Sequence, residues 1–377
     1  MKFRGWQRMS KNINKELLPE LRFPEFENLE SWNNEPLEDI YEFKVTNSLS
    51  RDKLNYDAGT VKNIHYGDIH TKFSTLFDIE KEFVPYINTT EPLGKIKKDC
   101  YCIEGDMVFA DASEDLDVVG KSIEVVNLNN EKLVAGLHTL LARQKEAKLV
   151  IGFGGYLFKS NRLREQIKKE AQGAKVLGIS AGRMSKIEVA YPSNKKEQQK
   201  IADCLSSLDD LITAHTQKYQ ALQTYKKGLM QNLFPAEGEI VPALRFPEFE
   251  DAGDWEIRLF SESIRLYRGS SPRPIKEYLT KKENGVNWIK IGDTSSTTNF
   301  TIRSVSEKIT PKGAEKSRKV KKGELILANS MSYGATYLLE LDGCIYDGWF
   351  VLREYEDAFN REFLLQLLNS TYMQEQY

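Results

Sequence analysis

Short apolar runs alternate with turn residues over most of the chain, while one long central stretch follows a different pattern. Between about residues 38 and 140, runs such as DMVFAD, KSIEVVNL and KLVAGLHTLLAR are separated by Gly, Asn and Asp. Runs of this length, bounded by turn residues, are typical of β-strands. Residues 156–173 have helical spacing instead, with Gly173 as the expected end of the helix. The pattern predicts a mixed α+β domain.

The central stretch predicts a short strand followed by one long helix. The strand is expected from Ile187 to Ala190, and Ser193 is the expected N-cap of a helix that no proline interrupts before Pro235. Apolar or half-apolar positions then recur at alternating spacings of four and three residues, which is the heptad pattern of a helix that pairs with another helix. The positions expected at this helix interface are Ile201, Leu205, Leu208, Ile212, Tyr219 and Leu222. A coiled-coil strut between two domains is the favoured interpretation, and an amphipathic core helix is the alternative.

A nine-residue phrase occurs twice in the chain. Residues 19–27 read PELRFPEFE and residues 242–250 read PALRFPEFE, and Trp32 and Trp255 follow the two copies at the same distance. A repeat with so long a period cannot be a solenoid or a propeller blade. It predicts two whole domains of one type in tandem.

The repeat continues beyond this phrase. IHYGD at 64–68 corresponds to IKIGD at 289–293, and GDMVFA at 105–110 corresponds to GELILA at 323–328. The loops between these anchors differ almost completely, as expected where a common scaffold carries two different recognition surfaces. The final run, FNREFLLQLLNSTYMQEQY, matches the helical segment of the first half, so the second copy of the strand and long helix is absent.

These boundaries divide the chain into four segments. We expect an N-terminal arm (1–18), a first domain (19–176), a central region with the long helix (177–235) and a second domain (236–377). The predicted fold class is α+β, with two tandem mixed domains joined by a long coiled-coil-type α-helix.

Composition narrows the class of protein. Hydrophobic residues make up 40% and charged residues 29%, enough for proper cores, and the formal net charge of −2 gives no global signal for nucleic acid. No stretch has the apolar length of a membrane span, and the N-terminal sequence lacks the apolar core of a secretory signal. The four cysteines lack paired metal-site spacing and are interpreted as reduced thiols. We expect a cytoplasmic globular protein.

Catalytic motifs are mostly absent. Gly120-Lys121-Ser122 ends like a phosphate-binding loop, but Asp115 stands where that motif requires glycine. No HExxH motif, no methyltransferase tetrad and no nuclease-like acidic cluster with a lysine occurs. The repeated pairs Gly67-Asp68 and Gly292-Asp293 are compatible with metal ligands, but a strand-end turn that uses a glycine at positive φ is the favoured interpretation.

Residue types that read duplex DNA gather in the variable loops. Arg and Lys contact guanine edges and phosphates, Asn and Gln contact adenine, and Ser and Thr contact either. The candidates in the first half are Arg51, Lys53, His65, His70 and Lys72. Those in the second half are Arg268, Ser270, Ser271, Arg273, Ser295, Ser296, Asn299, Asn329, Ser330 and Tyr333. Ordinary polar loops have the same composition, so these residues are a hypothesis.

As a whole the chain resembles the specificity subunit of type I restriction–modification systems. The resemblance rests on the duplicated LRFPEFE with its tryptophan, on NIHYGDI and WIKIGDT, on the GSSPRP loop, and above all on ISAGRMSKIEVAYPSNKKEQQKIADCLSSLDDLI. It extends from about Pro19 to the end of the chain.

The resemblance implies a non-catalytic subunit with two target recognition domains, each of which reads half of a bipartite double-stranded DNA sequence. It implies two modification (methyltransferase) subunits as partners, and restriction (translocase and nuclease) subunits that join them. The chain itself would bind no cofactor, and S-adenosylmethionine, ATP and Mg²⁺ are expected on the partner subunits. No membrane partner is expected.

One departure from the family changes the expectation for the long helix. Members normally carry a second conserved helix after the second domain, antiparallel to the first, and this sequence has none. The long helix would then pair with the long helix of a second copy of the chain, or the chain would be an inactive truncated allele. A stand-alone bipartite DNA-binding regulator and a protein-interaction scaffold with no DNA role remain as alternatives.

Overall fold

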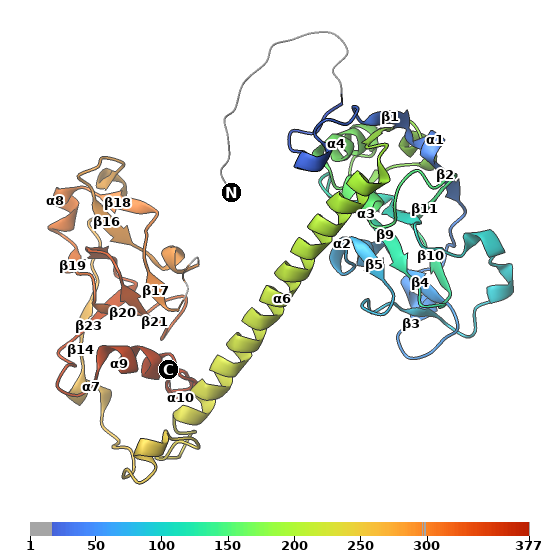
Figure 1. The fold of residues 1–377 in the computed structure, drawn as a ribbon. Helices are drawn as coiled ribbons and strands as arrows, with labels where there is room; N and C mark the ends of the chain where they lie inside the picture. The colour runs from blue at the N-terminus through green and yellow to red at the C-terminus, as the bar shows by residue number, and fades with distance from the viewer. Residues whose placement is uncertain (1–16, 296, 298, 377) are drawn as a thin grey trace. The chain divides into compact units, whose positions relative to one another are not determined.

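The chain forms two compact units whose division falls inside one long helix. The computed structural model describes residues 17–295, 297 and 299–376. One unit ends at Ala214 and the other begins at His215, within helix α6 (Lys195–Leu233) (Figure 1). The predicted N-terminal arm lies almost wholly outside the described residues, and the predicted domain boundaries stay a prediction.

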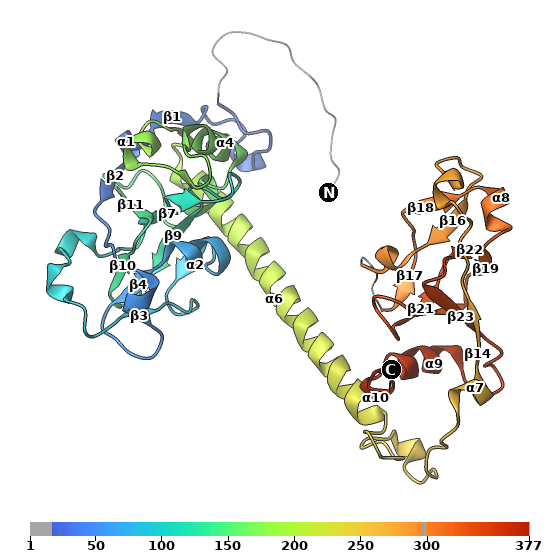
Figure 2. The same cartoon turned by 180° about the vertical axis from the view of Figure 1, so that it is seen from behind.

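The described part of the first unit contains a five-stranded sheet, a four-stranded sheet and two two-stranded sheets. The five-stranded sheet has the strand order β2-β11-β7-β9-β5, with neighbours antiparallel except for the parallel pair β5 and β9. Its strands are β2 (Tyr41–Lys44), β11 (Thr139–Gln144), β7 (Met107–Ala110), β9 (Ser122–Asn127) and β5 (Leu76–Asp78). Every residue of the central strand β7 is buried (Figure 2). Met107 and Phe109 belong to one hydrophobic core, and Val108 and Ala110 belong to another, so the strand is apolar along its whole length.

The four-stranded sheet of the first unit has the order β10-β4-β6-β3. Its strands are β10 (Leu133–Ala135), β4 (Lys62–Ile64), β6 (Tyr86–Ile87) and β3 (Leu54–Asn55). A separate two-stranded sheet pairs β1 (Asn33–Pro36) with β13 (Glu188–Tyr191), the strand that directly precedes the long helix. The strand predicted at 187–190 is therefore present, displaced by one residue.

The second unit repeats this topology. Its larger sheet has the order β14-β23-β20-β21-β17, and its other sheet has the order β15-β18-β16-β22-β19. The larger sheet is built from β14 (Arg265–Arg268), β23 (Trp349–Arg353), β20 (Leu325–Ala328), β21 (Thr336–Leu339) and β17 (Thr301–Ile302). The other contains β15 (Leu279–Thr280), β18 (Glu307–Ile309), β16 (Val286–Ile289), β22 (Gly343–Ile345) and β19 (Arg318–Val320). The five-stranded and four-stranded sheets of the first unit are reproduced strand for strand, with β19 added at one edge, whereas its two-stranded sheets have no counterpart among the described residues. The predicted α+β tandem fold is therefore confirmed.

The helices differ in detail from the prediction. The single helix predicted at 156–173 is two helices, α3 (Phe153–Leu157) and α4 (Asn161–Glu170), because Ser160 has extended backbone angles between them. The corresponding run in the second unit forms α9 (Arg361–Leu368) and α10 (Thr371–Gln374). Among the described residues, no helix is both long and apolar enough to cross a membrane.

The long helix α6 contains 39 residues, about 58 Å at the usual rise per residue. Its first turn is capped by Asn194, whose Oδ1 accepts a hydrogen bond from the Lys196 N–H at 2.9 Å. The prediction of Ser193 as N-cap was therefore wrong by one residue. Asn194 is the residue directly before the first helical turn, and an N-cap side chain reaches the orphan N–H groups only from that place.

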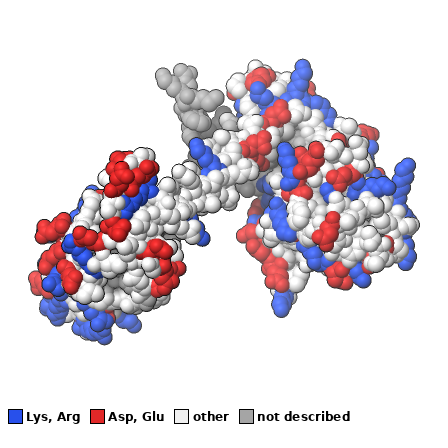
Figure 3. Space-filling model, turned by 90° about the horizontal axis from the view of Figure 1, so that it is seen from below, with Lys and Arg blue, Asp and Glu red and all other residues white. Residues whose placement is uncertain are grey.

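Most of the predicted interface positions on α6 are exposed. Ile201 packs against the first core, and Leu205 is 37% exposed, whereas Leu208, Ile212, Tyr219 and Leu222 are 50% to 63% exposed. Between Cys204 and Tyr225 the sequence has only three charged residues, and the long helix is drawn mostly white in Figure 3. The helix therefore presents a long uncharged surface with apolar side chains at heptad spacing.

The predicted glycine turns at the Gly-Asp pairs were wrong. Gly67 lies in α2 (Tyr66–Thr71) and Gly292 in the 3₁₀ helix η7 (Ile291–Thr294), and neither has a positive φ, because a helical turn follows each strand. Within the repeated anchor segments, the glycines with positive φ are instead Gly105 (89°) and Gly323 (92°). Each precedes an acid that accepts a backbone N–H from three residues earlier, Asp106 from Ile103 and Glu324 from Lys321.

A buried carboxyl group, Glu124 on β9, carries a pH dependence of stability. Its Oε2 accepts a hydrogen bond from the Gly155 N–H at 2.6 Å, while its Oε1 and the nearby Tyr41 hydroxyl make none among the described residues. Burial raises the pKa of Glu124 to about 7. An unfolded glutamate titrates near pH ~4.3, so as the pH rises from there to about 7 the unfolded chain releases its proton first and stability falls.

We predict that Glu124→Gln raises the free energy of unfolding at pH 8 by about 1–3 kcal/mol, because the neutral amide removes the cost of a buried charge. The amide oxygen can still accept from Gly155. At pH 4.5 the gain should nearly vanish. Urea denaturation at both pH values measures it, with the exposed Glu114→Gln as control. An equal effect of Glu124→Gln at both pH values would contradict the assignment.

Candidate nucleic-acid interface

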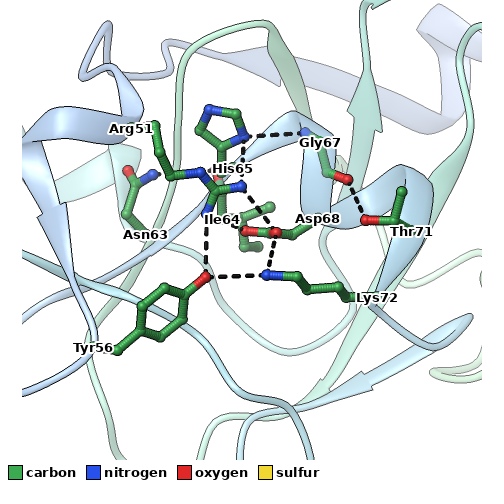
Figure 4. Close-up of polar contacts among 9 residues, drawn as sticks. All are labelled: Arg51, Tyr56, Asn63, Ile64, His65, Gly67, Asp68, Thr71 and Lys72. Carbon is green, nitrogen blue, oxygen red and sulfur yellow. Dashed lines mark hydrogen bonds and ion pairs between the residues drawn. The ribbon is translucent and has the colours of Figure 1, made fainter.

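The candidate surface of the first unit is organised by a buried aspartate at the start of α2. Strand β4 ends at Ile64, and the His65 Nδ1 accepts the Gly67 N–H at 3.1 Å and so caps the helix. Asp68, in the first turn, has only 1% of its side chain exposed (Figure 4). The Asp68 carboxylate binds two of the residues predicted to contact DNA, Arg51 and Lys72.

Arg51 is held flat against Asp68 by two hydrogen bonds. Its Nη1 and Nη2 lie 2.7 and 2.9 Å from the two carboxylate oxygens, and a third bond of 3.2 Å reaches the Tyr56 hydroxyl. The His65 Nδ1 lies 3.2 Å from Nη2 (Figure 4). With 43% of its side chain exposed, Arg51 presents a guanidinium of fixed orientation to solvent. Both Nη groups are already engaged by Asp68, Tyr56 and His65, so Arg51 contributes an oriented positive charge and not a free bidentate donor pair.

Lys72 approaches the same carboxylate from the next turn of α2. Its Nζ lies 3.0 Å from Asp68 and 3.3 Å from the Tyr56 hydroxyl, and half of its side chain is exposed. Burial by itself would raise the pKa of Asp68, but the hydrogen bonds from Arg51 and Lys72 outweigh it and hold this pKa below its usual range. Burial and the neighbouring Arg51 lower the pKa of His65, which agrees with its Nδ1 accepting the Gly67 N–H.

The other two predicted residues of this unit lie apart. Lys53 pairs with Glu91 at 3.2 Å and has 46% of its side chain exposed. His70 is half-buried, and its Nε2 lies 3.1 Å from the Ala112 carbonyl oxygen, while its Nδ1 is buried with no hydrogen bond among the described residues. The structure therefore brings Arg51, His65 and Lys72 together, whereas His70 contacts the Ala112 carbonyl and the edge of the Tyr66 ring.

Aromatic rings next to this cluster, of which Phe83 is well exposed, were not predicted from the sequence. The rings of Tyr56 and Phe83 stack with centroids 4.5 Å apart, and Phe83 is 69% exposed. The Tyr66 ring lies between those of His65 (4.7 Å) and His138 (5.3 Å). Tyr56 and Phe83 come from loops far apart in the sequence, so no local pattern indicated that they meet.

The second unit gathers its predicted residues around Asp347, in the turn that leads into β23. The Ser271 Oγ donates to Oδ1 at 2.6 Å, and the Arg273 Nη2 lies 3.5 Å from Oδ2. The backbone carbonyl of Asp347 accepts from the Asn329 Nδ2 at 3.0 Å and the Arg268 Nε at 3.4 Å. Chiefly because of the Ser271 hydrogen bond, the pKa of Asp347 is lowered. One aspartate therefore organises four predicted residues.

Close backbone packing makes this cluster possible. A Cβ on Gly269 would lie 1.9 Å from the Tyr346 carbonyl oxygen, so only glycine lets the loop before Ser270 approach the turn at Asp347. Arg273 is the most accessible member of the cluster, with 81% of its side chain exposed. The Asp-Gly pair at 347–348 was a turn signal in the sequence that could have drawn attention to Asp347.

The remaining predicted residues of this unit are scattered over neighbouring loops. Ser270 donates to the Lys316 carbonyl at 3.3 Å, and the exposed Ser295 donates to the Gly292 carbonyl at 3.0 Å. Asn299 is exposed with a positive φ of 54°. Ser330 and Tyr333 lie in the loop after β20, where Tyr333 is 60% exposed. Ser296 lies outside the described residues.

The two clusters provide recognition chemistry: oriented arginines, hydroxyls, amides and exposed rings. Within the described ranges, no three His, Cys, Asp or Glu side chains are placed to hold a metal ion. Lysine and arginine alternate with acidic side chains on the face drawn in Figure 3, as expected for a net charge of −2. Contact with an anionic ligand would therefore depend on local clusters.

Comparison with protein families gives one extended match. The sequence model of the family described as Type I restriction modification DNA specificity domain matches residues 30–224, which is more than half of the chain.

Curated relatives come from Methanocaldococcus jannaschii. The protein named as the MjaX specificity subunit of a type I restriction enzyme is 26% identical over 271 residues, 69% of this chain and 59% of that protein. The type I restriction enzyme MjaVIII specificity subunit is 25% identical over 234 residues, 59% of this chain and 53% of that protein. The chain thus spans a little over half the length of these relatives.

One solved structure shares the fold. It is described as the structural basis underlying complex assembly and conformational transition of the type I R-M system, and it covers 92% of this chain and 80% of its own, with a TM-score of 0.51 and 15% identity. The type I restriction-modification S subunit from M. genitalium covers 93% of this chain and 79% of its own, with a TM-score of 0.48 and 14% identity.

Proposed function

The chain belongs to the family of type I restriction modification DNA specificity domains, and from this premise we propose that it is the non-catalytic subunit that chooses the DNA sequence of a restriction–modification complex. Each unit would read one half of a bipartite, asymmetric double-stranded target. Two modification subunits would dock on the chain and supply the methyltransferase site with S-adenosylmethionine, and restriction subunits would supply the ATP- and Mg²⁺-dependent activities.

One observation carries this proposal: a repeated scaffold holds unlike polar groups. The two larger sheets have the same strand order, yet the first unit displays Arg51 and Lys72 on Asp68, and the second displays Arg273 and Ser271 on Asp347. Side chains that read base edges must be held in a defined orientation, and recognition by loops on a rigid frame allows the two halves to differ. Two unlike half-sites are therefore the expected target.

The long helix is proposed to serve assembly. Its exposed positions from Leu205 to Leu222 follow a heptad pattern and carry few charges, a surface suited to another helix. The partner helix would come from a modification subunit or from a second copy of the chain. The subunit would thus join two DNA-reading units and its partners through different surfaces.

The function is tested by methylation in a host that lacks other restriction systems. The chain is co-expressed with its cognate modification subunit, and host DNA is sequenced for methylated adenines. A bipartite motif with two unlike halves is the expected result. Absence of methylation, together with failure of the modification subunit to co-purify, would instead favour an inactive allele or a stand-alone DNA-binding protein.

We predict that Arg273→Ala weakens discrimination at one half-site by about 1–3 kcal/mol, if its guanidinium makes a bidentate base contact. Arg273 lies 3.5 Å from the Asp347 carboxylate and has 81% of its side chain exposed, so its guanidinium is accessible to a base. Binding to a panel of single-base variants of the target measures the effect. The exposed Arg265→Ala is the matched control, and uniform weakening over all sequences would identify a phosphate contact instead.

We predict that Leu208→Asp disrupts assembly without changing the methylated motif, because a charge buried between helices is costly. Association with the modification subunit, or self-association measured by light scattering, should weaken at least about tenfold. Gln217→Asp, at an exposed polar position of the same helix, controls for the introduction of an acid. A changed motif with normal assembly would show that the helix face is not an assembly surface.

A further inference from the structure

Two stacked aromatic rings lie beside the Asp68 cluster of the first unit. Tyr56 directly follows β3, and Phe83 lies in the segment 79–85 that joins β5 to β6. The two ring planes differ by 15°, with centroids 4.5 Å apart, so the rings lie face to face. Tyr56 is half-buried, whereas Phe83 is 69% exposed. The exposed ring is therefore supported from behind by the other.

The supporting ring is fixed by the cations of the cluster. The Tyr56 hydroxyl accepts from the Arg51 Nη1 at 3.2 Å and from the Lys72 Nζ at 3.3 Å (Figure 4). The same Lys72 ammonium lies 5.5 Å from the centroid of the tyrosine ring. Two positive charges thus lie next to the ring pair.

The segment that carries Phe83 is also held in place. The N–H groups of Lys81 and Glu82 both donate to the Asp78 carbonyl, at 2.9 and 3.1 Å. The Glu82 carboxylate accepts the Ser74 N–H at 2.7 Å. The two residues after Phe83 are buried. The ring therefore projects from a segment that is hydrogen-bonded on one side and buried on the other.

The second unit differs from the first at this place. Lys281 directly follows β15, where Tyr56 follows β3, and β17 is joined to β18 by only the residues 303–306. Ser306 of that short segment donates through its N–H and its hydroxyl to Asp293, at 2.9 and 2.8 Å. Asp293 is the counterpart of Asp68 in the repeat. The longer segment of the first unit leaves the buried acid to the two cations and carries the exposed ring instead.

We propose that Phe83 is a wedge that enters the base stack of the bound DNA, with Tyr56 as its support, so that the first unit opens one base step of its half-site. The inference rests on the proposed DNA-reading function and adds a deformation of the DNA to it. Apolar side chains inserted between bases unstack a step and kink the duplex. An aromatic ring stacks on any base, because every base has a π-face. The cations at the tyrosine hydroxyl are suited to the phosphates that flank such a step.

A base fits this ring better than a protein surface does. From residue 46 to residue 102, Phe83 is the only large apolar side chain that is exposed. Protein interfaces are built around a wider apolar centre, whereas insertion into DNA requires a single rigid side chain.

The wedge also predicts a form of sequence selection without contact to base edges. Pyrimidine–purine steps such as TA and CA/TG are the easiest to unstack, so the cost of opening a step depends on its sequence. We therefore expect a pyrimidine–purine step at the place where Phe83 enters the half-site.

The test uses the complex of the full chain with the modification subunit, without S-adenosylmethionine, and a duplex that carries the methylated motif. 2-Aminopurine, which fluoresces more strongly when it is unstacked, replaces one purine at a time outside the methylated adenines. Binding should raise the fluorescence at one step of one half-site. Phe83→Ala should abolish this rise and weaken binding at least about fivefold, because the stacking contact is lost.

Two further variants separate the role of the ring from a general effect of substitution. Phe83→Trp should keep the fluorescence rise, because an aromatic ring remains. Phe246→Ala removes a phenylalanine of similar exposure, 58%, outside the first unit, and should leave both the rise and the affinity unchanged.

The outcomes distinguish the wedge from the proposed function. Specific binding without a rise outside the methylated adenines would overturn the wedge alone, and so would a rise that Phe83→Ala leaves unchanged. Loss of the modification subunit from the Phe83→Ala complex would assign the ring to a protein contact and would also overturn it. If the unaltered complex prefers no DNA sequence, the proposed function fails and the wedge fails with it.

Discussion

The ion pair between Arg22 and Glu197 joins positions 175 residues apart and links the first copy of the repeated phrase to the start of α6. Removing two charges from water is costly, and such a pair stabilises a fold only when the remaining hydrogen-bonding positions are satisfied. Here they are, because Arg22 donates to two backbone carbonyls and Glu197 accepts from Trp32. Loss of one partner would leave the other charge buried, at a cost of about 3–5 kcal/mol.

This constraint explains the composition of the repeated phrase. Arginine supplies the planar donors, and proline starts the short 3₁₀ helix η1 (Pro24–Phe26) that turns the chain back over them. Phe26 is buried, and the Trp32 indole N–H donates to Glu197 directly before β1 begins. The same residues recur after residue 242 in the same local geometry, although the acid is absent there.

The repeat also separates residues that build the scaffold from residues that differ between the units. Asp106 pairs with Arg143 in the first unit, and Glu324 pairs with Arg353 at the matching place in the second. Asp68 and its counterpart Asp293 behave differently. Asp68 binds two exposed cations, whereas Asp293 accepts from the backbone and side chain of Ser306 and from the backbone of Lys290. The same buried acid thus orients a cationic surface in one unit and only a loop in the other.

The sequence by itself determined the tandem repeat, the strand-rich domains and the long helix, because each of these is encoded by local spacing or by similarity between segments. The predictions of a helix cap at Ser193 and of glycine turns at Gly67 and Gly292 were wrong, because several neighbouring residues at an element boundary have the same preference for caps and turns. Only the tertiary structure decided which strands are neighbours, that Asp347 gathers Arg273 with Ser271, and that Phe83 stacks on Tyr56. It also decided that Arg22 finds its carboxylate while Arg245 does not. These contacts join residues that are far apart along the chain. Their partners are chosen by packing and by the burial of polar groups, and neither can be predicted from local sequence.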